Sequence, residues 1–299
     1  MADGKWTSLS FTLNTGDKIP AVGLGTWQSK PGEVRDAVAA ALRAGYRHID
    51  TAAAYGNERE VGLGIKDSGV PREEIWITTK LDNPDHKQAL ESLDASLNKL
   101  GIEYIDLYLM HWPCSSDPAD PELHTAYADW DFIDTWREME KLPKSKAKNI
   151  GVSNFDITQL NRLLRTAKSV PAVNQVELHP NNPTPNLTKF CQDKGIHCTA
   201  YSILGSTNSP LVKDQTLAGI GEKHGRPIQQ VLLAWGLHHG YSVIPKSVNE
   251  NRIKANFAVN DLILHDEDLK ALDSLPDRFK VCDDEWLPHK IFLDREDKK

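Results

Sequence analysis

Four side chains that could together transfer a proton lie on, or just past, three short apolar runs of the chain. They are Asp50, Tyr55, Lys80 and His111. A phenol has an ordinary pKa near ~10 and is a poor acid at neutral pH, but a lysine ammonium within a few ångströms favours the phenolate and lowers that pKa. Asp50 would keep Lys80 charged, and His111 could donate a hydrogen bond to a substrate oxygen. The group predicts a tyrosine that is an acid toward a carbonyl and a base toward an alcohol.

Each of these residues also has a simpler interpretation. A buried aspartate beside a lysine is commonly a structural ion pair, and such pairs perturb pKa values without catalysis. Lys80 ends a predicted strand, where a Schiff-base aldolase could carry its amine. Asp50 opposes that alternative, since it would keep the lysine charged. The occurrence of all four residues near strand ends favours proton transfer.

A second group lies in the segment IPKSVNENRIKAN, residues 244–256. A predicted strand ends at Lys246 and Ser247, and a helix opens near Asn249. Amides at a helix start and nearby cations often hold phosphate after the last strands of a barrel. Lys246 as a point charge and Arg252 as a planar fork of donors suit a phosphate dianion, although a solvated basic helix start would look similar. The segment favours a cofactor that carries an extra phosphate.

Alternating strands and helices are predicted to position these groups. Short runs rich in Val, Ile, Leu and Tyr recur every few tens of residues, and most precede a stretch with helical periodicity. The expected strands are 21–27, 46–52, 75–81, 105–112, 149–155, 173–179, 197–203 and 242–247. The clearest helix signals cover 33–44, 86–100 and 156–166, with further helices opening at Pro227 and near 249–252, and a hairpin is expected around 14–17.

Eight such strands in 299 residues fit a closed (β/α)8 TIM barrel better than an open doubly wound sheet, as one domain over residues 1–299. Chemistry in such a barrel sits at the carboxyl ends of the strands. The long loop 113–129 and the tail from Pro276 are expected at that face. Three Gly-x-Gly segments lack the third glycine of the open-sheet dinucleotide fingerprint, so a dinucleotide would lie across the barrel mouth.

Composition excludes several classes of function. The net charge of −7 disfavours nucleic acid and acidic lipid as partners, and no run of 18 apolar residues predicts a membrane span. The four cysteines have no spacing suited to zinc, so we expect thiols and no metal. The chain shows no targeting signal, and we expect a cytoplasmic protein that is a monomer or a weak dimer.

Four segments resemble the signatures of the aldo-keto reductase family. They are GYRHIDTAAAYGNEREVG (45–62), LYLMHWP (107–113), IGVSNF (150–155) and IPKS (244–247), and the resemblance runs nearly end to end. It implies the barrel, the catalytic tetrad Asp50, Tyr55, Lys80 and His111, and NADPH as the cofactor. The cofactor-binding residues that it implies are Gly25, Thr26, Asp50, Ser153, Asn154, Gln175, Tyr201, Ser202, Leu204, Ser206, Lys246, Ser247, Arg252 and Asn256.

Within that set, the resemblance implies that Ser153, Asn154 and Gln175 hold the nicotinamide carboxamide and that Tyr201 stacks on the ring. Three features depart from the family pattern. Ala255 replaces a common glutamate that contacts adenine, Ile203 replaces a proline, and the usual turn glycine is absent between 142 and 149. The first two changes bear on how tightly the cofactor is held.

Aromatic residues are expected to shape the substrate site. Its predicted residues are Trp27, Tyr55, His111 and Trp112, with contributions from Tyr127, Trp130 and the tail around Trp286. An apolar slot with a polar end suits a small aldehyde or a sugar-derived carbonyl. The chain resembles fungal family members that act on glyceraldehyde, glycerol and short aldoses. Relatives associated with channels leave one further alternative, a non-catalytic NADPH-binding regulatory subunit.

Overall fold

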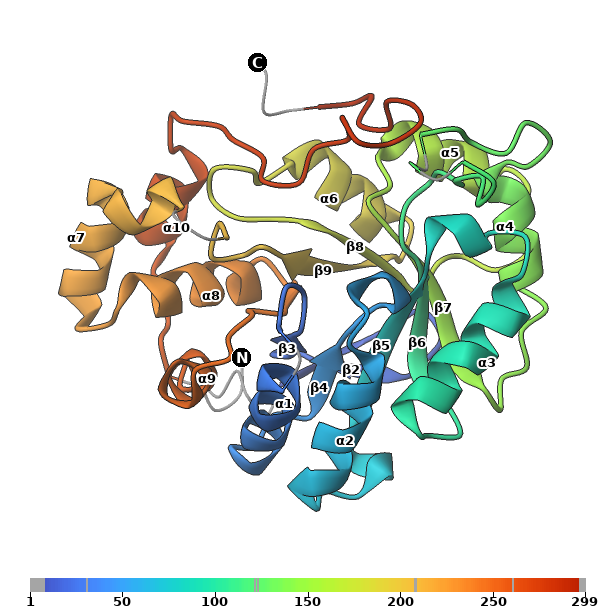
Figure 1. Cartoon of the computed structure of the whole chain (residues 1–299). Coiled ribbons are helices and arrows are strands. Elements are labelled where there is room, and N and C mark those ends of the chain that lie inside the picture. Colours follow the sequence, from blue (N-terminus) through green and yellow to red (C-terminus); the bar gives the residue numbers. More distant parts are fainter. Residues whose placement is uncertain are drawn as a thin grey trace.

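The computed structural model describes residues 9–30, 32–120, 122, 124–206, 209–259 and 261–295. Eight parallel strands form one sheet in their order along the chain (Figure 1). They are β3 (Leu24–Gly25), β4 (His48–Asp50), β5 (Trp76–Leu81), β6 (Ile105–Met110), β7 (Ala147–Ser153), β8 (Val173–Glu177), β9 (His197–Tyr201) and β10 (Ser242–Val243). Bridges from Val22 to Val243 and from Gly25 to Lys246 join the two edges of this sheet. The predicted (β/α)8 barrel is therefore confirmed.

The helices cover the outside of the barrel (Figure 1). They are α1 (Glu33–Arg43), α2 (Glu58–Ser68), α3 (Ala89–Leu100), α4 (Phe132–Met139), α5 (Ile157–Leu164), α6 (Pro185–Asp193), α7 (Gln215–His224), α8 (Ile228–His238), α9 (Glu250–Phe257) and α10 (Asp266–Asp273). Short 3-10 helices lie at η2 (Ala53–Tyr55), η3 (Arg72–Glu74), η4 (Asn83–Asp85) and η5 (Pro210–Lys213). No helix in the described ranges is long and apolar enough to cross a membrane.

Strands β5 and β6 are buried along their whole length. One side of each strand faces the helices and the other faces the barrel interior, so even Thr78 and Lys80 are inaccessible to solvent. Helices also approach one another closely around the barrel. A Cβ at Gly62 would lie 2.0 Å from the carbonyl oxygen of Leu100, so only glycine lets α2 pack at this distance from the end of α3.

The predicted hairpin is confirmed as the antiparallel pair β1 (Ser10–Thr12) and β2 (Lys18–Pro20). Asp156 caps α5 in a capping box with Gln159, and Pro227 is the residue before α8. The helix expected from residue 86 begins instead at Ala89, because Asn83–Asp85 forms a separate 3-10 turn that contains Pro84. All four cysteines lie in the described ranges and are free thiols.

Several expected strands are shorter in the structure. The last one was expected over 242–247, but β10 ends at Val243. Pro245 has no backbone N–H and cannot continue the ladder, so only the single bridge at Lys246 follows. The chain beyond β10 is therefore free to turn into α9 and to present its side chains at the mouth of the barrel.

Candidate active site

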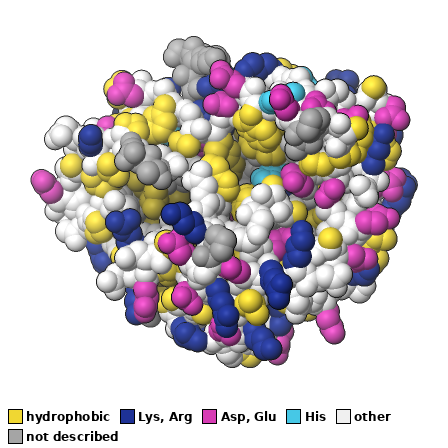
Figure 2. All heavy atoms as spheres, in the orientation of Figure 1, with side chains coloured by type: hydrophobic (Ala, Val, Ile, Leu, Met, Phe, Trp, Pro, Cys, Tyr) yellow, Lys and Arg dark blue, Asp and Glu magenta, His cyan; other side chains and the backbone are white. Residues whose placement is uncertain are grey.

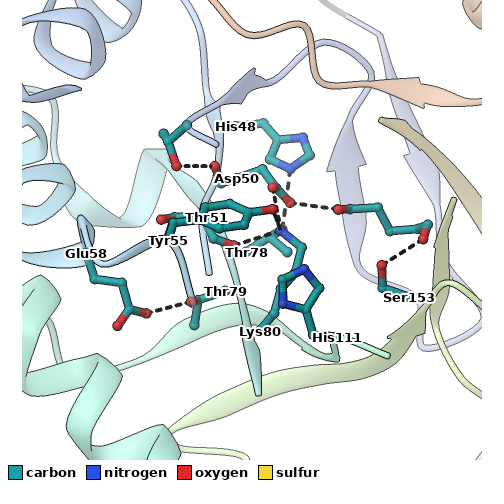
Figure 3. Close-up of polar contacts among 12 residues, drawn as sticks. His48, Asp50, Thr51, Tyr55, Glu58, Thr78, Thr79, Lys80, His111 and Ser153 are labelled. Atoms are coloured by element: carbon teal, nitrogen blue, oxygen red, sulfur yellow. Dashed lines mark hydrogen bonds and ion pairs between the residues drawn. The ribbon is translucent and has the colours of Figure 1, made fainter. Parts of the chain in front are cut away.

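Lys80 is the centre of the predicted tetrad and lies on β5 with no exposed surface. Its Nζ donates to Asp50 Oδ1 at 2.6 Å, to the Thr51 carbonyl at 2.8 Å and to the Tyr55 hydroxyl at 3.3 Å (Figure 3). Burial lowers the pKa of Lys80, and the charge and hydrogen bond of Asp50 oppose that effect. Three acceptors for three N–H groups fit the charged ammonium form.

The structure corrects the expected pKa of Tyr55. Burial raises the pKa of this phenol well above its ordinary value, and the negative charge of Asp50 acts in the same direction. The sequence-based expectation was a pKa lowered by Lys80. The pKa of Tyr55 rises because Asp50 lies 2.6 Å from the Lys80 ammonium and offsets its charge, and because burial penalises the charged phenolate. Tyr55 therefore carries its proton at neutral pH, as an acid must.

His111 follows β6, and its ring meets the Tyr55 ring edge to face at 5.7 Å. Burial lowers the pKa of His111 well below 6.5, and the positive charge of Lys80 lowers it further. The ring is therefore neutral and carries one N–H. Within the part of the chain that the structure describes, its buried Nδ1 has no hydrogen-bond partner. A neutral imidazole here can donate to a substrate oxygen without adding charge to the site.

Polar residues at the ends of β7 and β8 are connected to the tetrad. Gln175 Nε2 donates to Asp50 Oδ2 at 2.7 Å, and Ser153 Oγ donates to the backbone carbonyl of Gln175 at 2.8 Å. Asn154 donates to the His111 carbonyl at 3.0 Å and accepts from the Tyr201 hydroxyl at 2.7 Å. These four side chains therefore form one hydrogen-bonded wall that orients both Asp50 and His111.

A cavity of about 1130 Å³ opens above the tetrad. Every predicted cofactor residue and four of the predicted substrate residues line it, and the buried Lys80 lies next to the lining residues Asp50 and Tyr55. These lining residues are Gly25, Thr26, Trp27, Asp50, Tyr55, His111, Trp112, Ser153, Asn154, Gln175, Tyr201, Ser202, Leu204, Ser206, Lys246, Ser247, Arg252 and Asn256. The barrel thus brings these predicted residues to one cavity, although they are far apart in the sequence.

The end of the cavity at α9 is suited to an anion. Asn249 caps the helix by accepting from the Arg252 amide at 3.0 Å, and Ser247 Oγ accepts from the Asn249 amide at 3.1 Å. Lys246 and Arg252 are exposed, and neither has an acidic partner among the described residues. Two unpaired cations and a hydroxyl beside a helix start fit a phosphate monoester such as the extra phosphate of NADPH.

The expected parts of Tyr127 and Trp130 in the substrate site gain no support, since neither side chain lines the cavity. The Tyr127 hydroxyl donates to the Pro84 carbonyl, and the Trp130 indole donates to Thr135.

Some residues that line the cavity were not predicted from the sequence. The missed residues include Gln28, Ala54, Asp82, Val212, Gln229, Gln230, Asn249, Cys282 and Asp283. Asp82 had a usable signal, because it directly follows a predicted strand.

Three buried carboxylates hold the C-terminal segment in place beside the cavity, and each accepts hydrogen bonds from two successive backbone amides. Glu177 accepts from residues 281 and 282, Asp284 from 291 and 292, and Asp156 from 293 and 294. The segment thereby brings Trp286 to the cavity, with its ring 5.2 Å from that of Trp112 and perpendicular to it. This packing agrees with the expected contribution of the tail around Trp286.

Two of the departures from the family pattern lie near the cavity. Ala255 lines it at the expected adenine end, and its carbonyl accepts from Gln230 Nε2 at 2.8 Å. Ile203 also contributes to the lining, although its side chain is fully buried and lies next to Gly236. Both substitutions therefore change the cavity wall while leaving the tetrad untouched.

Comparison with known proteins places this geometry in a family. The model of the aldo/keto reductase family matches residues 21–277. The chain belongs to the aldo/keto reductase family. The predicted oxidoreductase is thereby confirmed. Glycerol 2-dehydrogenase (NADP(+)) of Saccharomyces cerevisiae is 46% identical over 94% of this chain and 96% of that protein. D-galacturonate reductase of Hypocrea jecorina is 47% identical over 88% of this chain and 89% of that protein.

A solved structure of an aldo-keto reductase from Bombyx mori, in complex with NADP, superimposes on this aldo/keto reductase with a TM-score of 0.82. The two chains are 37% identical, and the match covers 95% of each. The names of the yeast glycerol 2-dehydrogenase and of the Bombyx mori structure both include NADP, in agreement with the predicted cofactor.

Proposed function

We propose that this aldo/keto reductase reduces small aldehydes and ketones, including glyceraldehyde and short aldoses, with NADPH, and that it oxidises polyols in the reverse direction. One observation carries the proposal. The hydroxyl of Tyr55, held 3.3 Å from the buried Lys80 ammonium, lies at one end of a cavity whose other end presents Lys246 and Arg252. A proton donor and a phosphate site in one cavity match a reaction between a carbonyl and a phosphorylated dinucleotide.

When bound in the cavity, NADPH would supply the hydride that the carbonyl carbon accepts. His111 donates its N–H to the carbonyl oxygen and orients it toward Tyr55. Tyr55 gives its proton to that oxygen as the C=O bond becomes C–O–H, and the Lys80 ammonium stabilises the phenolate that remains. Asp50 holds Lys80 in place and charged. In polyol oxidation, the Tyr55 phenolate takes the proton back.

The cofactor contacts follow from the donor set. Lys246, Ser247 and Arg252 would bind the phosphate of the adenosine half. The side-chain Nε2 of Gln175 donates to Asp50, which leaves the side-chain amide oxygen of Gln175 to accept a hydrogen bond from the nicotinamide carboxamide. The ring of Tyr201 is a flat apolar surface for the nicotinamide.

The aldolase alternative needs an accessible neutral amine at Lys80. That side chain is fully buried, donates to Asp50 and does not line the cavity. A non-catalytic regulatory subunit would not need the tetrad, yet all four tetrad residues are present here and in contact with one another.

Monomeric or weakly dimeric assembly, a cytoplasmic location and a single domain over residues 1–299 stay predictions.

Reduction with NADPH deuterated at the transferable position of the nicotinamide tests the proposal. We expect glyceraldehyde to yield glycerol with one deuterium on the former carbonyl carbon, detected by mass spectrometry. A panel of aldehydes, ketoses and polyols with both NADPH and NADH would define the range. Borohydride treatment that trapped substrate on Lys80 would instead establish the aldolase, and a lack of carbonyl-dependent NADPH consumption across the panel would refute the proposed function.

A further inference from the structure

The charged side chains that line the cavity are separated by sign. Lys246 and Arg252 lie at the α9 end, whereas Asp82 and Asp283 lie beside the catalytic end. In Figure 2 a histidine lies in the hollow, with acidic side chains close beside it on one side. Among the described residues, Lys246 and Arg252 are the only Lys or Arg side chains that line the cavity. Apart from the Asp50–Lys80 pair, whose charges offset each other, a substrate that enters here meets the negative charges of Asp82 and Asp283.

Asp82 is held beside His111 by the barrel itself. It directly follows β5, and the carbonyl of Leu81 accepts from the His111 amide at 3.1 Å. Its Oδ1 accepts from the Asn83 amide at 2.8 Å. Burial raises the pKa of Asp82, and this hydrogen bond opposes the effect by stabilising the carboxylate.

Asp283 lies on the C-terminal segment at the opposite wall. The two preceding amides, of residues 281 and 282, are both bound by the buried Glu177, so the backbone is fixed up to this point. The Asp283 carbonyl accepts from the Trp286 indole at 3.2 Å, and its carboxylate accepts from the Glu285 amide at 3.1 Å. This exposed carboxylate therefore stands beside the Trp286 ring.

Neighbouring cations do not neutralise these two acids. Lys280 pairs with Glu177, Lys290 pairs with Asp284, and Lys87 pairs with Asp129. His124 lies against the Trp286 carbonyl at 3.3 Å and within 3.8 Å of Glu122. Among the described residues, neither Asp82 nor Asp283 has an ion-pair partner.

Three tryptophans complete this end of the cavity. Trp27 and Trp286 are 41% and 48% exposed, so their rings are open to a ligand, and Trp112 lies between Trp286 and His111. Aromatic faces attract cations, and organic ammonium groups bind where several rings and a carboxylate meet. A carboxylate-bearing substrate would find no donor of opposite charge and would be repelled by both aspartates.

We propose that the catalytic end of the cavity selects carbonyl substrates by charge, preferring those that carry an ammonium group to neutral ones and neutral ones to carboxylates. This inference rests on the proposed function. It separates the chain from its relative named D-galacturonate reductase, whose substrate by that name is a sugar acid. The selecting residues are Asp82 and Asp283, with the tryptophan rings as the apolar surface.

Three benzaldehydes that differ in one substituent test the proposal. They carry a trimethylammoniomethyl, an ethyl or a carboxymethyl group at the position opposite the aldehyde, and the methylene insulates the carbonyl from the charge. We expect kcat/KM with NADPH to fall in that order, with a ratio of about tenfold or more between cation and anion, because charge pairs and cation–π contacts each contribute several-fold. Raising the salt concentration should shrink the ratio.

The variants Asp82→Asn and Asp283→Asn should each lower the ratio by roughly two- to fivefold. Asp193→Asn is the matched control, because it removes one exposed negative charge on α6 outside the cavity and should leave the ratio unchanged. An anionic substrate that performs as well as the cationic one, or a ratio that persists in the double variant, would overturn the proposal. If even the neutral aldehyde consumed no NADPH, the proposed function would fail instead.

Discussion

The two ends of the cavity differ in how their polar groups are satisfied. At the catalytic end, Lys80 makes three hydrogen bonds within the protein and both oxygens of Asp50 are bound. At the α9 end, Lys246 and Arg252 are exposed and have no acidic partner among the described residues. Folding alone assembles the catalytic end, because leaving these buried groups unpaired would be costly. Lys246 donates only to the Gln28 carbonyl, at 3.3 Å, so under the proposed function the cofactor phosphate supplies the acidic partner at this end.

Lys80→Met should have the largest effect, because it breaks the end that folding completes. The change removes the ammonium from Tyr55 and leaves a carboxylate oxygen of Asp50 without its partner. We expect kcat to fall by roughly 10²- to 10³-fold and the free energy of unfolding to fall by ~3–5 kcal/mol. Steady-state kinetics and urea unfolding measure the two. Adding Asp50→Asn should restore part of the stability and none of the rate, whereas a wild-type kcat in the single variant would reduce Lys80 to a structural ion pair.

Lys246→Met and Arg252→Met should act on binding at the other end. Each change should weaken NADPH binding by about 10- to 100-fold, as expected for a lost charge-assisted contact. NADH binding should change much less, since NADH lacks the extra phosphate. Fluorescence titration gives both dissociation constants. Equal losses for the two cofactors would show that these residues do not bind that phosphate.

Asp284→Asn should have a moderate effect confined to the substrate. It weakens the attachment of residues 291 and 292 and so loosens the wall that carries Trp286. We expect KM for the carbonyl to rise by roughly three- to tenfold with a smaller change in kcat. The NADPH dissociation constant should stay the same, and a parallel loss of NADPH binding would mean that the segment has a general structural role instead.

The pH dependence of reduction should be the smallest effect. The pKa of Tyr55 is raised well above its ordinary value and that of His111 is lowered well below 6.5, so neither group changes protonation near neutrality. With saturating NADPH, kcat should vary by less than about twofold between pH ~6 and pH ~8. A limb with an apparent pKa close to 6.5 would indicate that His111 titrates and that its burial has been misjudged.

The sequence was sufficient to predict where the catalytic residues meet. Asp50, Lys80 and His111 each end a strand or follow one, and parallel strands in a barrel share one face, so their convergence follows from periodicity alone. The predicted helix start at Asn249 likewise indicated the proposed phosphate site. Motif resemblance then extended the set to residues such as Gln175 and Tyr201, which all line the cavity.

Properties that depend on burial and on distant partners could not be predicted in this way. The direction of the Tyr55 pKa shift depends on how far burial and Asp50 outweigh Lys80, which only the packed structure reveals. The bonds between Glu177 and residues 281 and 282 join positions more than 100 apart in sequence. Nothing in the sequence around Tyr127 predicts that its hydroxyl donates a hydrogen bond to the Pro84 carbonyl.

The phenol of Tyr55 is the central element of the account, and Tyr55→Phe tests it most directly. This change removes one oxygen and keeps the ring that packs against His111. Carbonyl reduction and NADPH binding should be measured on the same preparation. We expect kcat to fall by at least ~10²-fold while the NADPH dissociation constant stays within about twofold of the wild-type value. A variant that reduces carbonyls at the wild-type rate would contradict the assignment of Tyr55 as the proton donor.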